Sequence, residues 1–273
     1  MLVQKNKFIV GLTTYNNENL AISVPGLARL QKKFVLIIFN DNPETKIKQS
    51  DIRRLGYRGK LHIINTKQNQ GLCRARLAIL DYVRTKRIKS DWFIFVDDDD
   101  VLLTLDAPRI SEKHFAVIQN MAVIRTRLCD VLRVMKNPND FTIDDENVYL
   151  VRPHVGLAGT VVKSGKMLRM GDVLNTVRDQ ITEIDESLDF RAPTDMMMWS
   201  ALNIVSRHDK SDTTPIYMDK TNYLATDLDT AATKYGKPVA PSKNAQKQIL
   251  QALNQYDAVV RDALDAAAPA GQE

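Results

Sequence analysis

The chain has 273 residues and an ordinary globular composition, with 44% hydrophobic and 26% charged residues, which excludes a disordered or fibrous protein. Its length allows one large domain or two small ones. The two cysteines, Cys73 and Cys129, exclude a disulfide framework and a four-cysteine zinc site. No apolar run reaches the roughly 18 residues of a membrane span, and the N-terminus lacks the apolar run of a signal peptide. We therefore expect a soluble, cytoplasmic protein.

The net charge of +5 is unevenly distributed along the chain. Residues 1–90 contain 18 Lys and Arg against 5 Asp and Glu, a net charge of +13, which leaves −8 for the remainder. A basic front half is typical of proteins that bind polyanions, such as nucleotide diphosphates or nucleic acids. A solvated basic surface is the alternative interpretation.

The first hundred residues alternate between short apolar runs and segments with helical spacing. The pattern predicts strands over residues 8–13, 34–40, 61–65 and 92–96, and helices over residues 19–32, 47–55 and 71–87. This order indicates βαβ units in a mostly parallel sheet, in which ligands bind outside the carboxyl ends of the strands. Polar segments occupy all four of those positions, at residues 13–17, 40–43, 68–71 and 97–100.

The pattern weakens beyond residue 100. We expect helices over residues 110–121, 193–206 and 242–267. Short strands are predicted over residues 122–129, 131–135, 148–151, 159–162, 215–218 and 222–225. No shift in composition marks a linker, so the sequence predicts one continuous domain. Its two halves span residues 1–102 and 103–240, and a C-terminal helix with a mobile tail spans residues 241–273.

Four successive carboxylates, at residues 97–100, follow the fourth apolar run in FIFVDDDDVL. Repulsion among them raises their pKa values and loosens the strand end unless a cation compensates. Mg²⁺ and Mn²⁺ prefer oxygen ligands, and Mg²⁺ sites typically use one or two carboxylates together with substrate phosphates. Asp97 and Asp99 are spaced to share one face of such a site. An acidic turn that caps the next helix is the alternative.

In this context the sequence resembles the family 2 glycosyltransferases, which have the GT-A fold. That fold is an α/β architecture with a Rossmann-like, mostly parallel sheet flanked by helices and an acceptor-side α+β portion. The resemblance rests on the first strand running into TTYN, the second strand ending in ND, the segment QNQGLCRARLAIL, and FVDDDD. It covers residues 8–102 well and residues 150–230 loosely.

The resemblance implies an inverting transfer of a sugar from a nucleotide-diphosphate donor, with a UDP-sugar favoured, to a hydroxyl of a glycan or polymer. Mn²⁺ or Mg²⁺ would be the cofactor. The first half of the chain would bind the nucleotide sugar, and the second half would bind the acceptor.

The resemblance also implies a role for each residue that matches the family pattern. The metal would be bound by Asp99 with Asp97 and Asp100. Structural alternatives remain, such as turn formation for Asp41 and Gly71 and simple surface exposure for Arg76. The donor nucleotide would be bound by Thr13, Thr14, Tyr15, Asp41, Asn69, Gly71, Arg76, Asp97 and Asp98.

An inverting mechanism needs a base that deprotonates the acceptor hydroxyl. The resemblance places this base at the start of a late helix, which here is Asp195 in APTDMMMW, with Thr194 where the family commonly has Glu. Helix capping is the structural alternative. Asp185 and Glu186 are rival candidates for the base.

Many family members carry a late histidine that completes the metal shell. After Tyr223 this sequence continues as LATDLDT without a histidine, so Asp227, Asp229 or water would take that place. His154 either faces the acceptor or is structural. Trp199 either stacks on a sugar or packs against the core.

Three other functions stay open. Sugar transfer to a hydroxymethylated base in DNA suits the basic front half, but a duplex substrate requires base flipping and the acceptor half is acidic. A nucleotidyltransferase has a related fold but needs a glycine-rich phosphate loop, which TTYNNEN lacks. A non-enzymatic nucleotide-sugar-binding module would be expected to have lost its carboxylates, and the acidic run is intact.

Overall fold

The computed structural model describes residues 6–31, 34–106, 109–111, 113–124, 148–151, 156–184, 194–209 and 214–226, together with residues 251, 254–255 and 257–258. Within these ranges, no helix is long and apolar enough to cross a membrane. The elements in chain order are β1 (Asn6–Thr14), η1 (Asn17–Asn19), α1 (Leu20–Leu30), β2 (Phe34–Asn40), α2 (Gln49–Arg54), β3 (Lys60–Asn65), α3 (Leu72–Thr85), β4 (Ser90–Asp97), β5 (Val101–Leu102), β6 (His114–Ile124), β7 (Val148–Val151), β8 (Val161–Lys163), α5 (Ser164–Ile184), α6 (Thr194–His208) and β9 (Thr214–Thr226).

The strands form one mixed sheet in the order β3-β2-β1-β4-β8-β6-β9-β5, with β7 paired to β6 outside this path. Strands β3, β2, β1 and β4 are parallel to one another. Strand β8 then runs antiparallel to both β4 and β6, and β9 runs parallel to β6. The four parallel strands therefore direct their carboxyl ends to one edge of the sheet.

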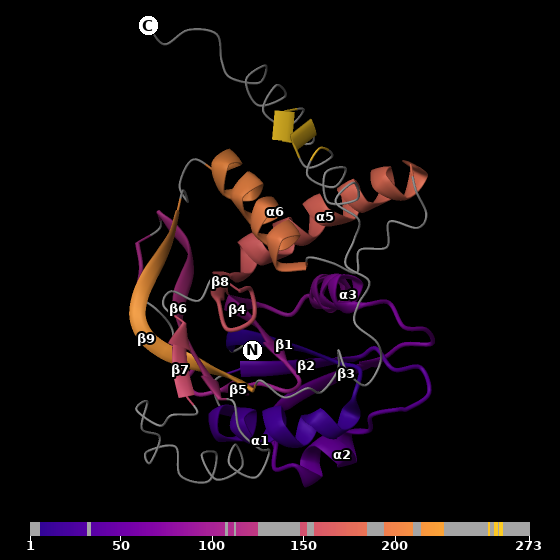
Figure 1. Cartoon of the computed structure of the whole chain (residues 1–273). Coiled ribbons are helices and arrows are strands. Elements are labelled where there is room, and N and C mark those ends of the chain that lie inside the picture. Colours follow the sequence, from indigo (N-terminus) through magenta and orange to yellow (C-terminus); the bar gives the residue numbers. More distant parts are fainter. Residues whose placement is uncertain are drawn as a thin grey trace, which may run out of the picture.

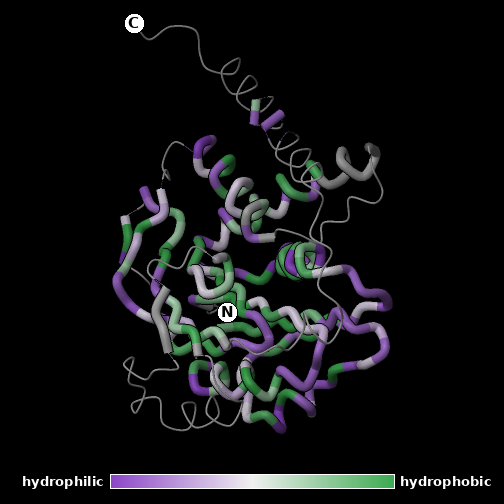
Figure 2. Tube along the Cα trace, in the orientation of Figure 1, coloured by the Kyte–Doolittle hydropathy of each residue, from purple (hydrophilic) through white to green (hydrophobic). Residues whose placement is uncertain are grey.

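Helices cover both faces of the parallel strands, with α3, α5 and α6 on one face and α1 and α2 on the other (Figure 1). Successive residues of a strand point to opposite faces, so Ile9 packs with the first group of helices and Val10 with the second. All seven residues of β2 are buried, as expected for a strand covered on both faces. Figure 2 shows hydrophobic residues concentrated along the central strands.

Helices α3 and α5 approach each other closely at Gly171. A Cβ atom at this position would lie 3.1 Å from Cδ1 of Leu80, which is tighter than an ordinary contact. Glycine at residue 171 therefore lets the two helices pack, and α5 in turn contacts α6. This layer places the start of α6 above the carboxyl end of β4.

The fold prediction, an α/β sheet of the GT-A type, is confirmed. All four parallel strands and the three helices between them form as predicted, with ends shifted by a few residues. Helix 193–206 corresponds to α6, and strand 148–151 to β7.

The prediction of a helix over residues 110–121 is wrong, because most of this segment forms strand β6. Phe115, Ala116 and Val117 are all buried. When consecutive residues of a strand are buried, the strand loses the alternation of apolar and polar residues that identifies strands in a sequence. Helix α5 was not predicted, and the two expected late strands form the single strand β9. The expected strand over residues 131–135 and most of the expected helix over residues 242–267 lie outside the described residues.

Candidate active site

The carboxyl ends of β1, β2 and β4 bring the polar segments of the N-terminal half together. Thr13 pairs with Phe39 on one side and with Asp97 on the other, and Thr14 pairs with Asn40. The side chains of Thr13 and Thr14 are buried. The loop after β2 is connected to the loop after β1 because Asn42 Nδ2 donates to the carbonyl oxygen of Tyr15 over 3.1 Å. These loops form one rim.

Asp41 organises the loop that leads into helix α3. Its amide donates to the carbonyl oxygen of Thr14 over 2.7 Å. One carboxylate oxygen accepts from the amide of Gln70 over 2.7 Å, and the other accepts from the amide of Gly71 over 2.8 Å. Asp41 is buried. The carboxylate expected to contact the nucleoside therefore also fixes the start of α3.

Gly71 is the N-cap residue of α3 and has φ 78° and ψ 161°. Residues with a Cβ atom rarely adopt this conformation, so glycine is required by the backbone itself. The Asn69 side chain supports the same turn, because its Oδ1 accepts from the Gly71 amide over 3.0 Å. The expected family residues Asn69 and Gly71 thus shape the turn that begins helix α3.

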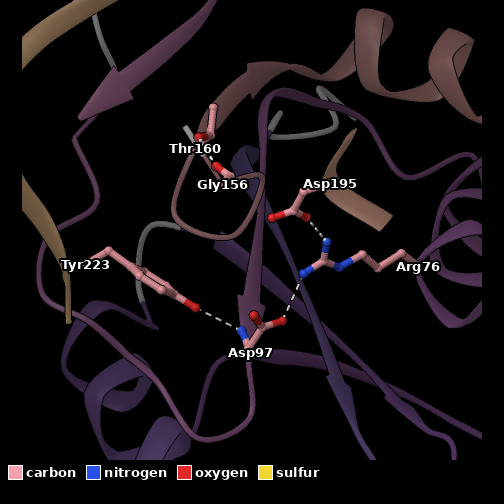
Figure 3. Close-up of polar contacts among 6 residues, drawn as sticks. All are labelled: Arg76, Asp97, Gly156, Thr160, Asp195 and Tyr223. Atoms are coloured by element: carbon pink, nitrogen blue, oxygen red, sulfur yellow. Dashed lines mark hydrogen bonds and ion pairs between the residues drawn. The ribbon is translucent and has the colours of Figure 1, made fainter. Parts of the chain in front are cut away.

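Arg76 connects the end of β4 to the start of α6. Its Nη2 donates to Asp97 Oδ1 over 2.9 Å, and its Nη1 donates to Asp195 Oδ1 over 2.9 Å (Figure 3). The Arg76 side chain is 1% exposed, whereas those of Asp97 and Asp195 are 33% and 46% exposed. The expectation that Arg76 could be an ordinary exposed residue is wrong, because one buried guanidinium joins two carboxylates 98 positions apart in the sequence.

Charge and packing both hold the Arg76 guanidinium in place. Burial alone would lower the pKa of Arg76, but the Asp97 and Asp195 carboxylates outweigh burial and raise it. The guanidinium carbon also lies 5.2 Å from the centre of the Phe95 ring, within the range of a cation–π interaction. The Arg76 guanidinium is therefore a positive charge held in one position between the carboxyl end of β4 and the start of α6.

Residues 97–100, which we call the acidic turn, are closed by a hydrogen bond from the Asp100 amide to the Asp97 carbonyl oxygen over 3.2 Å. Asp98 Oδ1 accepts from Asn19 Nδ2 over 3.3 Å. Burial, with repulsion from the Asp99 and Asp97 carboxylates, raises the pKa of Asp98 to about 7. Asp99 is partly exposed, and Asp100 is buried. The four carboxylates thus occupy different environments.

Tyr223 of β9 contacts the acidic turn from the side opposite Arg76 (Figure 3). Its hydroxyl oxygen accepts from the Asp97 amide over 3.0 Å. Burial, and then the neighbouring Asp100 and Asp97 charges, raise the pKa of Tyr223 well above its usual value. In the sequence, Tyr223 is marked only by the missing histidine in LATDLDT, the segment that follows it. Its partners lie more than 120 residues upstream, so no local pattern identifies its role.

The acidic turn fits a divalent cation that is bound together with a donor. Within the described part of the chain, no group of three or more His, Cys, Asp and Glu side chains is placed to hold a metal. Asp97 and Asp99 supply oxygen ligands only, and Mg²⁺ typically combines one or two carboxylates with substrate phosphates and water. Two carboxylates alone would therefore hold a cation only together with further oxygen ligands, such as those of a bound phosphate group.

Of the remaining sequence candidates, only Trp199 lies within the described residues, which also include the late histidine His208. His208 lies in the last turn of α6, at the opposite end from Asp195, and its Nε2 is 2.9 Å from Asp257 Oδ1. It is about 20 Å from the start of the helix at 1.5 Å per residue, too far to contact the acidic turn. Trp199 packs edge-on against Phe115, 6.5 Å between ring centres. Outside the described residues lie His154, Asp185, Glu186, Asp227 and Asp229.

Part of the chain matches a known protein family. Residues 9–115 match the model of "Glycosyl transferase family 2", which confirms the resemblance found in the sequence. No curated protein matches the chain.

Two solved structures of TarS residues 1–349 from S. aureus have a similar fold. The structure in complex with UDP has a TM-score of 0.51 and 15% identity, and the similarity covers 90% of this chain and 65% of that one. The second has a TM-score of 0.50 and 13% identity, over 92% of this chain and 82% of that one. The chain thus spans about two thirds of the length of the first of these structures. At such low identity the likeness shows the shared fold alone.

Proposed function

From the match of residues 9–115 to glycosyl transferase family 2, we propose that this protein is an inverting, metal-dependent glycosyltransferase. It moves a sugar from a nucleotide-diphosphate donor to a hydroxyl of a glycan or polymer. The observation that carries this proposal is the Arg76 bridge, which brings Asp195 of α6 beside Asp97 at the end of β4. The candidate base, Asp195, and the candidate donor site at Asp97 are thus bonded to the same guanidinium.

The donor is held at the rim formed by the loops after β1 and β2. Thr13, Thr14 and Tyr15 line the nucleoside pocket, and Asp41 fixes the loop that closes it at Gly71. The basic N-terminal half favours the diphosphate electrostatically. A uridine nucleotide is supported by the shared fold with TarS, whose structure contains UDP. Donor binding therefore depends on loop geometry as much as on direct contacts.

Asp195 acts as the base. Its ion pair with Arg76 holds the carboxylate in place beside the end of β4, and its 46% exposure leaves it accessible to an acceptor. As the acceptor oxygen bonds to the anomeric carbon, its proton passes to Asp195 and the bond from that carbon to the diphosphate oxygen breaks, with inversion. Asp97 and Asp99 would hold a divalent cation, which when bound neutralises charge on the diphosphate leaving group.

Thermal denaturation with nucleotides tests this function directly. A ligand that binds the folded state raises the melting temperature by mass action. We expect UDP or a UDP-sugar to raise it, Mn²⁺ to enlarge the increase, and Asp99→Asn to remove the enlargement. Asp106→Asn is the matched control, because Asp106 is an exposed aspartate of the following loop that pairs with Lys220. No shift with any nucleotide diphosphate would contradict the proposal.

A further inference from the structure

Tyr223 closes the acidic turn at both of its ends. Its hydroxyl oxygen accepts from the Asp97 amide over 3.0 Å, and it also hydrogen-bonds with the Asp100 side chain. Because a carboxylate is an acceptor, the hydroxyl donates its proton to Asp100. The Asp100 amide in turn donates to the Asp97 carbonyl oxygen. One phenol thus fixes the first and the last residue of the turn relative to each other.

The surrounding structure leaves the Tyr223 ring little freedom to move. Tyr223 is 1% exposed and pairs with Leu102, two residues after the turn. Gly159 lies against the ring, where a Cβ atom would be 2.8 Å from Tyr223 Cγ. The Gly159 carbonyl oxygen accepts from Asn222 Nδ2 over 2.9 Å, and the Gly159 amide donates to the Phe95 carbonyl oxygen over 2.9 Å. Residue 159 therefore connects the ring to the strand that carries Asp97.

We propose that Tyr223 is a positioning residue for the metal site, and that Asp100 is the partner of Tyr223 and does not bind the metal itself. This inference rests on the proposed function, because it assigns the metal to Asp97 and Asp99. It revises the expectation that Asp100 is a third ligand. The Asp100 side chain is buried, and its carboxylate accepts a hydrogen bond from the Tyr223 hydroxyl. This carboxylate is therefore already bound to the protein. The tyrosine acts on the metal only through the shape of the turn.

Tyr223→Phe removes the hydroxyl and keeps the ring. We would measure Mn²⁺ binding by electron paramagnetic resonance of free Mn²⁺ in the presence of UDP, and UDP binding without metal by calorimetry. Substitution of groups that orient metal ligands typically weakens metal binding about 10–100-fold, so we expect a loss of about 10-fold in Mn²⁺ affinity. Metal-free UDP affinity should fall less than Mn²⁺ affinity, because the loops after β1 and β2, which Tyr223 does not contact in the proposed site, also hold the nucleotide.

Tyr57→Phe is the matched control. Tyr57 is also fully buried, and its hydroxyl donates to the Lys60 carbonyl oxygen over 2.9 Å, between α2 and β3. Its loss should also lower the melting temperature, since it removes one buried hydrogen bond where Tyr223→Phe removes two. Mn²⁺ affinity should not change. The comparison separates a role in positioning the metal from a general effect on stability.

Two variants of Asp100 distinguish a positioning partner from a metal ligand. In Asp100→Asn the amide oxygen still accepts from the tyrosine hydroxyl, whereas Asp100→Ala removes the acceptor. We expect Asp100→Asn to bind Mn²⁺ more tightly than Asp100→Ala, and Asp100→Ala to match Tyr223→Phe. Equal, severe losses in both Asp100 variants would identify Asp100 as a ligand and overturn the inference.

The remaining outcomes are also decisive. Wild-type Mn²⁺ affinity in folded Tyr223→Phe would overturn the positioning role. Failure of the unaltered protein to bind Mn²⁺ with UDP would overturn the metal-dependent function and this role with it. Weakened Mn²⁺ binding in Tyr223→Phe, with Tyr57→Phe unaffected, would support the inference. If Tyr223→Phe does not fold, the two Asp100 variants provide the same test.

Discussion

Replacing Arg76 by lysine keeps the positive charge but removes the fork that joins Asp97 to Asp195. The guanidinium reaches both carboxylates at 2.9 Å through two different nitrogen atoms. A lysine ammonium is a compact charge on a flexible stem and cannot reproduce this planar geometry. Arg76→Lys should therefore lose one of the two ion pairs and release either the acidic turn or the start of α6.

The size of the effect follows from the exposure of the partners. A hydrogen bond to a charged group contributes about 1.5–3 kcal/mol. Because Asp97 and Asp195 are 33% and 46% exposed, solvent screening favours the lower end, about 1.5 kcal/mol. For a chain of this size that corresponds to about 3–6 °C in melting temperature. Misplacement of a catalytic group by about 1 Å lowers the rate about 100-fold, so kcat should fall by that factor.

The assay measures release of the nucleoside diphosphate from a sugar nucleotide in the presence of acceptor, together with thermal denaturation. Arg84→Lys is the control, because Arg84 lies on the same helix and pairs with Asp172 at the surface. Exposed pairs contribute at most about 1 kcal/mol, so this variant should keep the wild-type kcat. A folded Arg76→Lys enzyme with wild-type kcat would refute the argument that Arg76 positions Asp195.

Three further predictions concern the base, the turn before α3 and the pH dependence of stability. Asp195→Asn still accepts from Arg76 but cannot take a proton, so donor binding should persist while transfer falls about 10²–10⁴-fold; retained transfer would place the base elsewhere. Gly71→Ala forces a side chain into φ 78° and should destabilise the protein by about 1–3 kcal/mol, whereas Gly165→Ala, with open space around it, should not. Burial, and then the Lys86 charge, lower the pKa of His62 below 6.5, so the free energy of unfolding should fall as the pH decreases below 6.5. Urea unfolding at several pH values should show that this free energy falls less steeply with pH in His62→Gln.

Much of the parallel half of the fold could be predicted because its strands are buried on both faces. A run such as FVLIIFN leaves few alternatives to a central strand, and the polar residues after each run must then meet at one edge. The same logic placed Asp41, Gly71 and the acidic turn on one rim before the structure was known. These are local patterns, each contained within about ten residues.

The second half depends on contacts that no local pattern contains. Glycine disfavours a helix interior, yet Gly171 is the point at which α5 packs on Leu80. Strand β6 is specified by pairing with β8 and β9. Tyr223 could not be assigned because its partner Asp97 lies 126 positions away. The placement of Asp195 followed from the family resemblance, whereas its contact with Arg76 required the structure.

The burial of Arg76 has a consequence for the order in which the chain folds during synthesis. During synthesis from the N-terminus, the strands that precede residue 100 leave the ribosome well before α6. A guanidinium enters the interior only when its charge is matched, and one of its two carboxylates belongs to Asp195. Until that residue has been translated, Arg76 lacks half of its partners. The candidate active site is therefore completed late, and a prematurely terminated chain that ends before residue 195 cannot contain both ion pairs of Arg76.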